Sequence, residues 1–293
     1  YGMNKGAIDI LAEKGVKLIV TVDNGIAAVE EIDYANSLGI DTVITDHHQP
    51  TGKIPNAVAV IDMHQSDCPS KYKMLSGVGV AFKLVMALEG ENCDVSSLLD
   101  NYSDLLCIGT VGDIVELKSE NRVFVKRGLV NIQESDRAGI NALIETAGIA
   151  GKKITSGNVS FTLVPRINAV FSGKSVSLLL TDDENEAMSI AKQLNEDNNE
   201  RKEIEKNILM KIDEMVKANP HITNDRVLVI DGEGWHQGVI GIVAAKVKEF
   251  FGKPTVIISR DGEDAKGSGR SVEGFSLCDA VFAAVTLWRQ DFH

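Results

Sequence analysis

The opening sixty or so residues alternate short apolar runs with stretches of helical spacing, and this alternation restricts the fold more than any other feature. The apolar runs at 17–22, 41–45 and 57–61 have the length and composition of buried parallel strands. Between the first two runs, residues 27–38 carry apolar side chains at helical spacing and are followed by Gly39. Strands that alternate with helices of about a dozen residues predict a doubly wound, parallel α/β sheet.

The middle of the chain changes character. Residues 76–147 are predicted to be mostly helical, with Gly-Val-Gly at 77–79 near a helix start. Residues 154–164 have β character, which predicts an extended segment leading into the run that contains Pro165. From 183 to 217 the charges alternate in sign along a helix-favouring stretch, which predicts a solvated helix that connects two domains.

A second, smaller α/β unit is predicted after Asn219-Pro220, where the long helix should end. Its expected elements are a strand at 226–230, a helix at 239–251, a strand at 254–259 and a glycine-rich extended segment at 265–271. We therefore expect three parts: a larger α/β domain at 1–180, a connecting helix at 181–219 and a smaller α/β domain at 220–293.

Side chains that can bind metal ions follow directly after predicted strands. Asp23 follows the first strand, Asp46-His47-His48 follow the second, and Asp113 ends the segment Gly-Thr-Val-Gly-Asp. Because the carboxyl ends of parallel strands line one crevice, the first two groups are expected in one site. Carboxylate oxygens and imidazole suit Mn²⁺ or Mg²⁺, and two such ions can bridge a phosphate and activate a water molecule.

Each of these segments also has an ordinary explanation. An aspartate after a strand is more often a helix cap or a turn residue than a ligand. Gly-Thr-Val-Gly-Asp alone could be a helix terminus. The order and spacing of the three segments, together with the motifs that follow them, favour a metal site.

Six segments together resemble the DHH phosphoesterases, and their wording is most similar to the RecJ branch of single-strand-specific DNA exonucleases. They are VDNGI at 22–26, TDHH at 45–48, GTVGDIVEL at 109–117, PRINA at 165–169, GWHQGVIGIVAAKV at 234–247 and KGSGRS at 266–271. The resemblance covers nearly the whole chain. It implies a DHH-type parallel α/β domain, a long connecting helix and a smaller DHH-associated C-terminal domain.

The resemblance also implies roles for individual residues. The aspartate matching Asp23 bridges two Mn²⁺ or Mg²⁺ ions in the family, and His47 and Asp113 match further metal ligands. His48 matches the histidine that contacts the scissile phosphate. Asp46 is expected to orient and polarise its histidine neighbour from outside the coordination shell of the metal ions.

A second group of candidate residues lies in the C-terminal part. His236 and Gly238 precede a predicted helix start, where free backbone N–H groups and the helix dipole favour an anion. Ser268 and Arg270 lie in the glycine-rich segment, which we also interpret as a loop around Arg270, whose fork suits phosphate oxygens. Joined to the resemblance, these four residues and Arg166 are predicted to hold the DNA backbone or its 5′ end. The ordinary alternative is a βα turn with a structural arginine.

The chain departs from the family pattern in three places. The family's DxDG first motif does not occur, so we expect that motif and one or two sheet strands to be missing. After PRINA the chain reads Val-Phe-Ser-Gly-Lys at 170–174, where the family continues with a small residue and Gly-Arg. Lys174 can replace the charge of that arginine but not its bidentate geometry. The chain ends at 288–293, where the family has a glycine-rich GGH segment, so we expect that segment and any following OB-type domain to be missing.

Composition limits the cellular setting. No run approaches the roughly 20 apolar residues of a membrane span, and the first residues do not resemble a signal peptide. Four scattered cysteines favour a reducing cytoplasm over a disulfide or zinc framework. The net charge of −12 argues mildly against nucleic acid, although basic groups can gather locally.

The predicted function is hydrolysis of single-stranded DNA from its 5′ end by two metal ions, in recombination and repair. One alternative is a DHH phosphodiesterase acting on short oligoribonucleotides or cyclic dinucleotides. The other is a non-catalytic remnant that binds single strands. The resemblance implies a single-strand-binding protein or a helicase as partner, no membrane association and a monomeric state.

Overall fold

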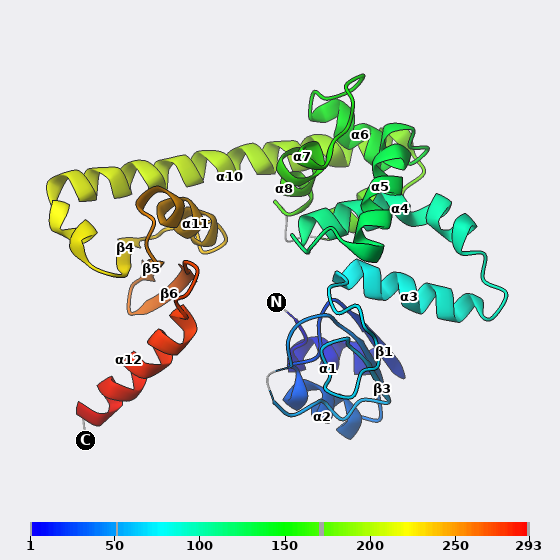
Figure 1. Ribbon diagram of the computed structural model, residues 1–293, viewed down its shortest axis with the longest axis horizontal. Helices are drawn as coiled ribbons and strands as arrows, with labels where there is room; N and C mark the ends of the chain where they lie inside the picture. The colour runs from blue at the N-terminus through cyan, green and yellow to red at the C-terminus, as the bar shows by residue number, and fades with distance from the viewer. Residues whose placement is uncertain (1, 51, 170–172, 292–293) are drawn as a thin grey trace. The chain divides into compact units, whose positions relative to one another are not determined.

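The computed structural model describes residues 2–50, 52–169 and 173–291, with side chains described as far as residue 284. The chain forms two compact units, Tyr1–Asn195 and Glu196–His293. The helix α10 (Glu184–Ala218) passes from one unit into the other as one unbroken ribbon (Figure 1). Among the described residues, no helix is both long and apolar enough to cross a membrane.

Unit 1 begins with the predicted parallel sheet. Its strands, in the order β1-β2-β3, are β1 (Leu18–Val22), β2 (Asp41–Thr45) and β3 (Ala59–Ile61). Both strand pairs are parallel, with Val22 opposite Thr45 and Thr45 opposite Ile61. The first two helices are α1 (Lys5–Glu13) and α2 (Val29–Ser37). A small core of Ile8, Ala35 and Ile40 joins these helices.

Strand β1 lies at one edge of this sheet, and part of its apolar surface is exposed. Leu18, Val20 and Val22 are each more than two-fifths exposed. Within the described part of the chain, β1 pairs with β2 alone. An apolar edge strand of this kind is the usual place for further strand pairing. The expectation that one or two further strands belong to this sheet stays a prediction.

Helices make up the rest of unit 1. They are α3 (Gly77–Glu89), α4 (Val95–Gly112), α5 (Ser119–Gln133), α6 (Ala138–Thr146), α7 (Ser156–Asn158), the π-helix η1 (Val159–Leu163), α8 (Val164–Ile167) and α9 (Lys174–Leu180). Their core is centred on fully buried residues such as Ile132, Ile140 and Leu143. The predicted departure at 170–172 lies outside the described residues, and Lys174 begins α9 with an exposed side chain.

The prediction of an extended segment at 154–164 is wrong, because residues 156–167 are helical throughout. Thr155 and Asn158 form a reciprocal capping box, in which each side chain accepts the other's backbone N–H. Val159 and Leu163 then lie on the buried side at 0% exposure. Local capping and burial on one helical face therefore outweigh the strand preference of β-branched residues.

Unit 2 is the predicted smaller α/β fold, built on the second half of α10. It contains the 3₁₀ helix η2 (Pro220–Asn224), β4 (Leu228–Glu233), α11 (Ile240–Phe251), β5 (Thr255–Asp261), β6 (Asp264–Arg270) and α12 (Leu277–Asp291). β4 pairs with β5 in parallel, and β5 pairs with β6 in an antiparallel hairpin. Ile208 and Ile212 of α10 pack with Ile230 and Val243 in the core of this unit.

Candidate functional site

Each strand of the sheet in unit 1 is followed directly by an aspartate. Asp23 follows β1, Asp46 follows β2 and Asp62 follows β3. The backbone N–H of Asp23 donates to Thr45 O at 2.9 Å, and that of Asp46 donates to Ile61 O at 3.0 Å. The strand ladder therefore continues for one more residue, and the three aspartates lie at the same carboxyl edge.

His47 is the centre of the candidate site. Its Nε2 atom lies 2.9 Å from Asp23 Oδ1 and 3.3 Å from Asp113 Oδ2, and its side chain is only 11% exposed. The Asp23 carboxylate, and then Asp113, raise the pKa of His47 against the opposing effect of burial. The sequence-predicted ligands Asp23, His47 and Asp113 are therefore brought together. Ligand atoms of Asp23, His47 and His48 also lie within 4.8 Å of one another.

The geometry of these groups fits a divalent metal ion. Nε2 of His47 is buried and has no hydrogen-bond partner among the described residues, although two carboxylates approach it closely. Two ligands at right angles on an ion with bonds of about 2.1 Å are separated by about 3 Å. The contacts at 2.9 and 3.3 Å match that separation. Oxygen and imidazole donors without a thiolate suit Mn²⁺ or Mg²⁺.

The Val-Asp-Asn-Gly segment holds Asp23 through an unusual backbone. Asp23 has a φ of 64°, a left-handed conformation that aspartate tolerates better than most residues. Gly25 has a φ of 114°, and a Cβ atom there would lie 2.8 Å from Thr21 Oγ1 and 3.2 Å from a methyl group of Ile44. The turn is therefore closed tightly against the sheet, which fixes where the Asp23 carboxylate can lie.

Asp46 orients the two histidines that follow it. Its side chain is 1% exposed, and Oδ2 accepts the N–H of Ile26 at 2.9 Å. Oδ1 accepts the N–H of His47 at 2.8 Å and contacts His48 Nδ1 at 2.7 Å. Burial alone would raise the pKa of Asp46, but the bonds from Ile26, His48 and His47 together lower it. His48, held through Nδ1, is 60% exposed and presents its other nitrogen outward.

Asp62 is a candidate that the sequence predictions missed. It is 3% exposed, and its Oδ1 accepts the N–H of His64 at 2.7 Å. Its Oδ2 is buried without a hydrogen-bond partner in the described part of the chain. Burial, and to a smaller extent the charge of Asp46, raise the pKa of this carboxyl. The signal that could have found it is the same as for Asp23 and Asp46: an aspartate directly after a parallel strand.

Arg166, predicted to contact DNA, makes its described polar contacts inside unit 1. The guanidinium donates to Asn195 Oδ1 at 3.0 Å and to the carbonyl oxygen of Thr162 at 2.6 Å. The residue is 8% exposed, and burial lowers its pKa. These contacts tie α8 to the first part of α10. Its predicted role toward substrate stays untested.

Arg166→Ala is expected to lower the free energy of unfolding by about 2–4 kcal/mol, because two part-buried acceptors lose their donor and a cavity forms at a buried position. Urea denaturation followed by circular dichroism measures this change. Arg122→Ala, which removes an exposed arginine of the same unit, is the matched control and should change stability by less than about 0.5 kcal/mol. Equal effects of the two substitutions would contradict a structural role for Arg166.

The candidate residues of unit 2 gather at the start of α11. Gly241 lies in the first turn of that helix, and a Cβ atom there would be 3.0 Å from Ser268 Oγ and 3.2 Å from Arg270 Nη2. Arg270 is the last residue of strand β6, which confirms the extended segment predicted at 265–271, whereas the description of Arg270 as part of a loop is wrong. His236 Nδ1 accepts the N–H of Gly238 at 3.2 Å, which places both residues in the turn before the helix.

This arrangement can hold an anion. Val239, the N-cap residue of α11, makes no side-chain capping bond, and the N–H groups of Ile240 and Ile242 donate to the carbonyl oxygens of His236 and Val239. The positive end of the helix dipole still favours negative charge here, and a guanidinium and a hydroxyl lie beside Gly241 in the first turn. A phosphate group has the charge and the acceptor oxygens for these donors.

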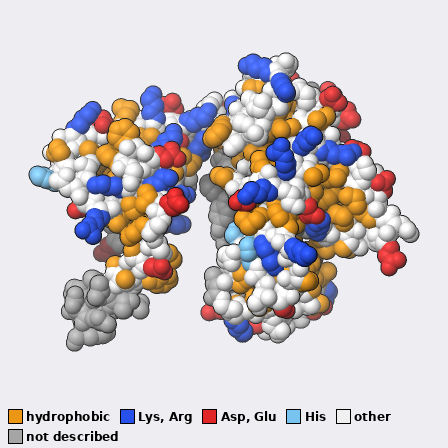
Figure 2. Space-filling view, in the orientation of Figure 1, with side chains coloured by type: hydrophobic (Ala, Val, Ile, Leu, Met, Phe, Trp, Pro, Cys, Tyr) orange, Lys and Arg blue, Asp and Glu red, His pale blue; other side chains and the backbone are white. Residues whose placement is uncertain are grey.

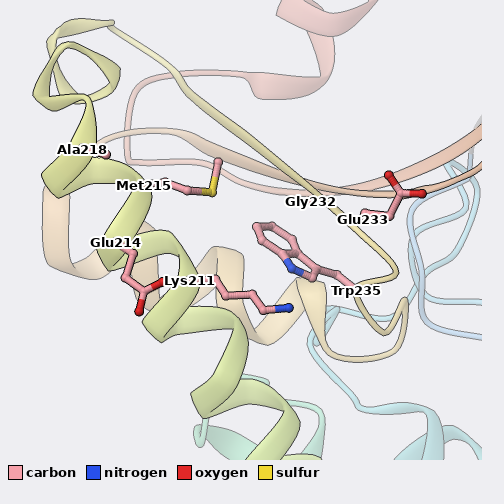
Figure 3. Close-up of a pocket in the computed structure, with 7 residues that line it drawn as sticks. All are labelled: Lys211, Glu214, Met215, Ala218, Gly232, Glu233 and Trp235. Atoms are coloured by element: carbon pink, nitrogen blue, oxygen red, sulfur yellow. The ribbon is translucent and has the colours of Figure 1, made fainter.

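A pocket of about 480 Å³ lies elsewhere in unit 2, between α10 and β4 (Figure 3). Trp235 forms part of its wall, and the indole ring lies against Gly232, where a Cβ atom would be 2.2 Å from the ring. Trp235 is 5% exposed and its carbonyl accepts the hydroxyl of Ser259. Trp235 therefore anchors the Gly-Trp-His-Gln-Gly turn in the core. None of the predicted substrate-binding residues lines this pocket.

Comparison with known families gives two matches. Residues 3–110 match the family described as "DHH family, N-terminal domain", and residues 224–288 match the "DHHA1 domain". Asp23 and the Asp-His-His tripeptide lie inside the first match, and Asp113 lies just beyond it. The turn at His236 and the strand with Arg270 lie inside the second.

Two curated relatives carry the same printed name, single-stranded-DNA-specific exonuclease RecJ. The Bacillus subtilis protein is 38% identical over 287 residues, which are 96% of this chain and 36% of that protein. The Escherichia coli protein is 36% identical over an alignment of 310 positions that covers 98% of this chain and 53% of that protein. The chain therefore spans between about one third and one half of the length of these relatives.

Solved structures give the same result. RecJ from Thermus thermophilus in complex with Mn²⁺ superimposes with a TM-score of 0.82 at 31% identity, covering 97% of this chain and 42% of that one. An exonuclease RecJ bound to manganese has a TM-score of 0.79 at 31% identity, covering 96% of this chain and 69% of that one. The arrangement of α/β unit, long helix and smaller α/β unit is thus that of these proteins.

Proposed function

The chain belongs to the RecJ group of the DHH family, and from this premise we propose that it hydrolyses single-stranded DNA from the 5′ end with two Mn²⁺ or Mg²⁺ ions. The observation that carries the proposal is the convergence of the Asp23 and Asp113 carboxylates on Nε2 of His47. This nitrogen is buried and has no hydrogen-bond partner among the described residues. Relatives with the printed name of single-stranded-DNA-specific exonuclease, and structures that contain manganese, support it.

The residues of the site have separate tasks in this proposal. Asp23, His47 and Asp113 hold metal, and Asp23, whose carboxylate is half exposed, is free to serve a second ion with its other oxygen. When bound, the ions supply positive charge to the phosphate and lower the pKa of a water molecule. Asp46 holds His48 through Nδ1, so that Nε2 faces the phosphate oxygens.

Unit 2 is proposed to hold the sugar–phosphate backbone of the strand. Arg270 and Ser268 provide donors for one phosphate beside the positive end of α11, with His236 and Gly238 in the adjoining turn. Arg166 is proposed as a further contact in unit 1. Figure 2 shows Lys and Arg side chains on the same face of unit 1 as histidine, so basic groups gather locally despite a net charge of −12.

We also propose the setting that these roles imply. The protein would act in DNA recombination and repair, in the cytoplasm and as a monomer, with a single-strand-binding protein or a helicase as partner. The domain limits of 1–180, 181–219 and 220–293 are likewise a proposal. The two family matches, at 3–110 and 224–288, fall within the first and last of these parts and support it.

The test is degradation of 5′-phosphorylated single-stranded DNA in Mn²⁺. It uses the chain itself and a chimera in which the chain replaces the matching segment of the Bacillus subtilis relative. We expect mononucleotides to be released from the 5′ end by the chimera, and the release to stop with EDTA or with Asp113→Ala. Activity of the chain alone would show that the family's first motif is dispensable.

Two other outcomes would contradict the proposal. Faster hydrolysis of dinucleotides than of long strands would favour the small-substrate phosphodiesterase. Binding of single strands without cleavage, in the chain and in the chimera, would favour the non-catalytic remnant. Duplex DNA is the control substrate and should be degraded far more slowly.

A further inference from the structure

We propose that the first turn of α3 is a spacer that sets the distance between the carboxylates of Asp23 and Asp113, and that Gly77 is a positioning residue for the metal site. The inference rests on the proposed function, because it takes Asp23 and Asp113 as metal ligands. It assigns a purpose to Gly-Val-Gly at 77–79 and to the glycine and threonine of Gly-Thr-Val-Gly-Asp.

The first contact of this spacer is between Gly77 and Asp23. A Cβ atom built on Gly77 would lie 2.3 Å from both Cγ and Oδ1 of Asp23 and 2.5 Å from its Cβ. Gly77 is the first residue of α3 and lies outside the positive-φ region, so its backbone conformation is open to any residue. Space therefore explains this glycine: the main chain of α3 lies directly against the carboxylate.

The contact also supports the charge of Asp23. The N-terminus of α3 carries the positive end of the helix dipole, which stabilises a carboxylate placed against it. Asp23 itself has the left-handed φ of 64°, a conformation that costs free energy unless the surroundings maintain it. The first turn of α3, which has no side chain at Gly77, thus covers one side of the Asp23 side chain.

The second contact joins the same turn to α4. Ser76, the N-cap residue of α3, has its hydroxyl 3.0 Å from Thr110 Oγ1, and both residues are almost completely buried. A Cβ atom on Gly109 would lie 2.7 Å from Val78 Cγ1, so the helices touch closely here. The N-cap Ser76 and the first two residues of α3 therefore contact Asp23 on one side and α4 on the other.

The last step leads to the second carboxylate. Asp113 is the C-cap residue of α4, and its N–H donates to the carbonyl oxygen of Gly109 at 3.0 Å. Asp113 therefore lies one helical turn beyond the contact with α3. Asp23 and Asp113 come from a strand end and a helix end, and α3 is the element that touches both supports. Because α3 packs between these two supports, it sets the distance between the carboxylates of Asp23 and Asp113 around His47.

The experiment compares two glycines of one helical turn. Gly77→Ala places a methyl group on Asp23, whereas Gly79→Ala places one 3.2 Å from the flexible end of Leu75. We measure Mn²⁺ affinity of the full chain from the electron paramagnetic resonance signal of free Mn²⁺, and the Tm without metal. We expect Gly77→Ala to raise the Kd at least about tenfold and Gly79→Ala to change it less than about twofold, with both metal-free Tm values near that of the parent.

A double substitution separates this inference from the proposed function. Asp23→Ala should weaken Mn²⁺ binding, and adding Gly77→Ala to it should change nothing further, because the carboxylate is already absent. If Gly77→Ala binds Mn²⁺ like the parent, the spacer is refuted while the metal site stands. If Asp23→Ala itself leaves Mn²⁺ binding unchanged, the proposed metal site fails.

Thr110→Val decides the question if Gly77→Ala does not fold. Valine keeps the shape of threonine but removes the bond to Ser76, which loosens α3 from the α4 side. We expect the Kd for Mn²⁺ to rise several-fold while the chain stays folded. An unchanged Kd with a lowered Tm would assign these residues to packing alone and overturn the inference.

Discussion

His47→Ala is expected to reduce the rate of Mn²⁺-dependent hydrolysis of single-stranded DNA by roughly a thousandfold. This loss exceeds the roughly 10–100-fold loss that is typical when a residue hydrogen-bonded to a metal ligand is replaced. The reason is that Nε2 is the point on which both carboxylates converge, at 2.9 and 3.3 Å. Without it, Asp23 and Asp113 face each other with no neutral ligand between them. Initial rates of nucleotide release by the chimera, at saturating Mn²⁺, measure the effect.

His64→Ala is the matched control for this substitution. His64 lies beyond the third strand, where its ring nitrogen pairs with Gln49 and its backbone N–H, which alanine retains, donates to Asp62. We expect His64→Ala to keep the rate within about threefold of the parent, since it removes no group from the cluster. Equal losses in the two variants would mean that general damage to this loop region, rather than loss of a ligand, explains the His47 result.

The proximity of the candidate ligand residues was predictable from sequence because their placement depends on local rules. A strand of five or six residues brings its last side chain to the carboxyl edge of the sheet, wherever the sheet lies in the molecule. Asp23 and the Asp-His-His tripeptide follow such strands, so their proximity needed only the parallel pairing of β1 and β2. Asp62 follows the third predicted strand in the same way, so the same rule applied to it could have found it.

The supports of the site could not be predicted in the same way. The role of Gly77 depends on the distance between a helix start and a carboxylate 54 positions earlier in the sequence, and no local pattern encodes it. The prediction of an extended segment at 154–164 was wrong for a related reason. Its β-branched residues read as a strand, but Val159 and Leu163 are buried in a helical core that forms only in the folded chain.

The candidate anion site of unit 2 is an intermediate case. Ser268 and Arg270 are two positions apart, so in a strand they point to the same face. Placing Arg270 in a loop hid this relation, although both residues were singled out. The pairing of β6 with β5, from Arg270 opposite Thr255 to Asp264 opposite Asp261, turns the pair toward α11.

Asp46→Asn is expected to lower the free energy of unfolding by about 2–4 kcal/mol at pH 7 and to impair catalysis by releasing His48. Asp46 accepts bonds on both oxygens, from Ile26 on one side and from His47 and His48 on the other. An asparagine can keep only one of these oxygens. Its amide group would then oppose a buried N–H donor, so one bond is lost and a donor is left unsatisfied.

The pH dependence of stability tests the same substitution in a second way. The pKa of Asp46 in the folded chain lies below its ordinary value of 3.8, because the bonds outweigh burial. The stabilisation by the charged carboxylate is therefore fully present above the ordinary pKa and is lost as the pH falls through the lowered one. The difference in unfolding free energy between parent and variant should be largest near neutral pH and shrink below about pH 4. Asp41→Asn, at an exposed position of the same strand, is the control and should show a small difference at every pH. A difference for Asp46→Asn that stays constant into acid would mean that shape, and not the charged carboxylate, holds the Asp-His-His turn.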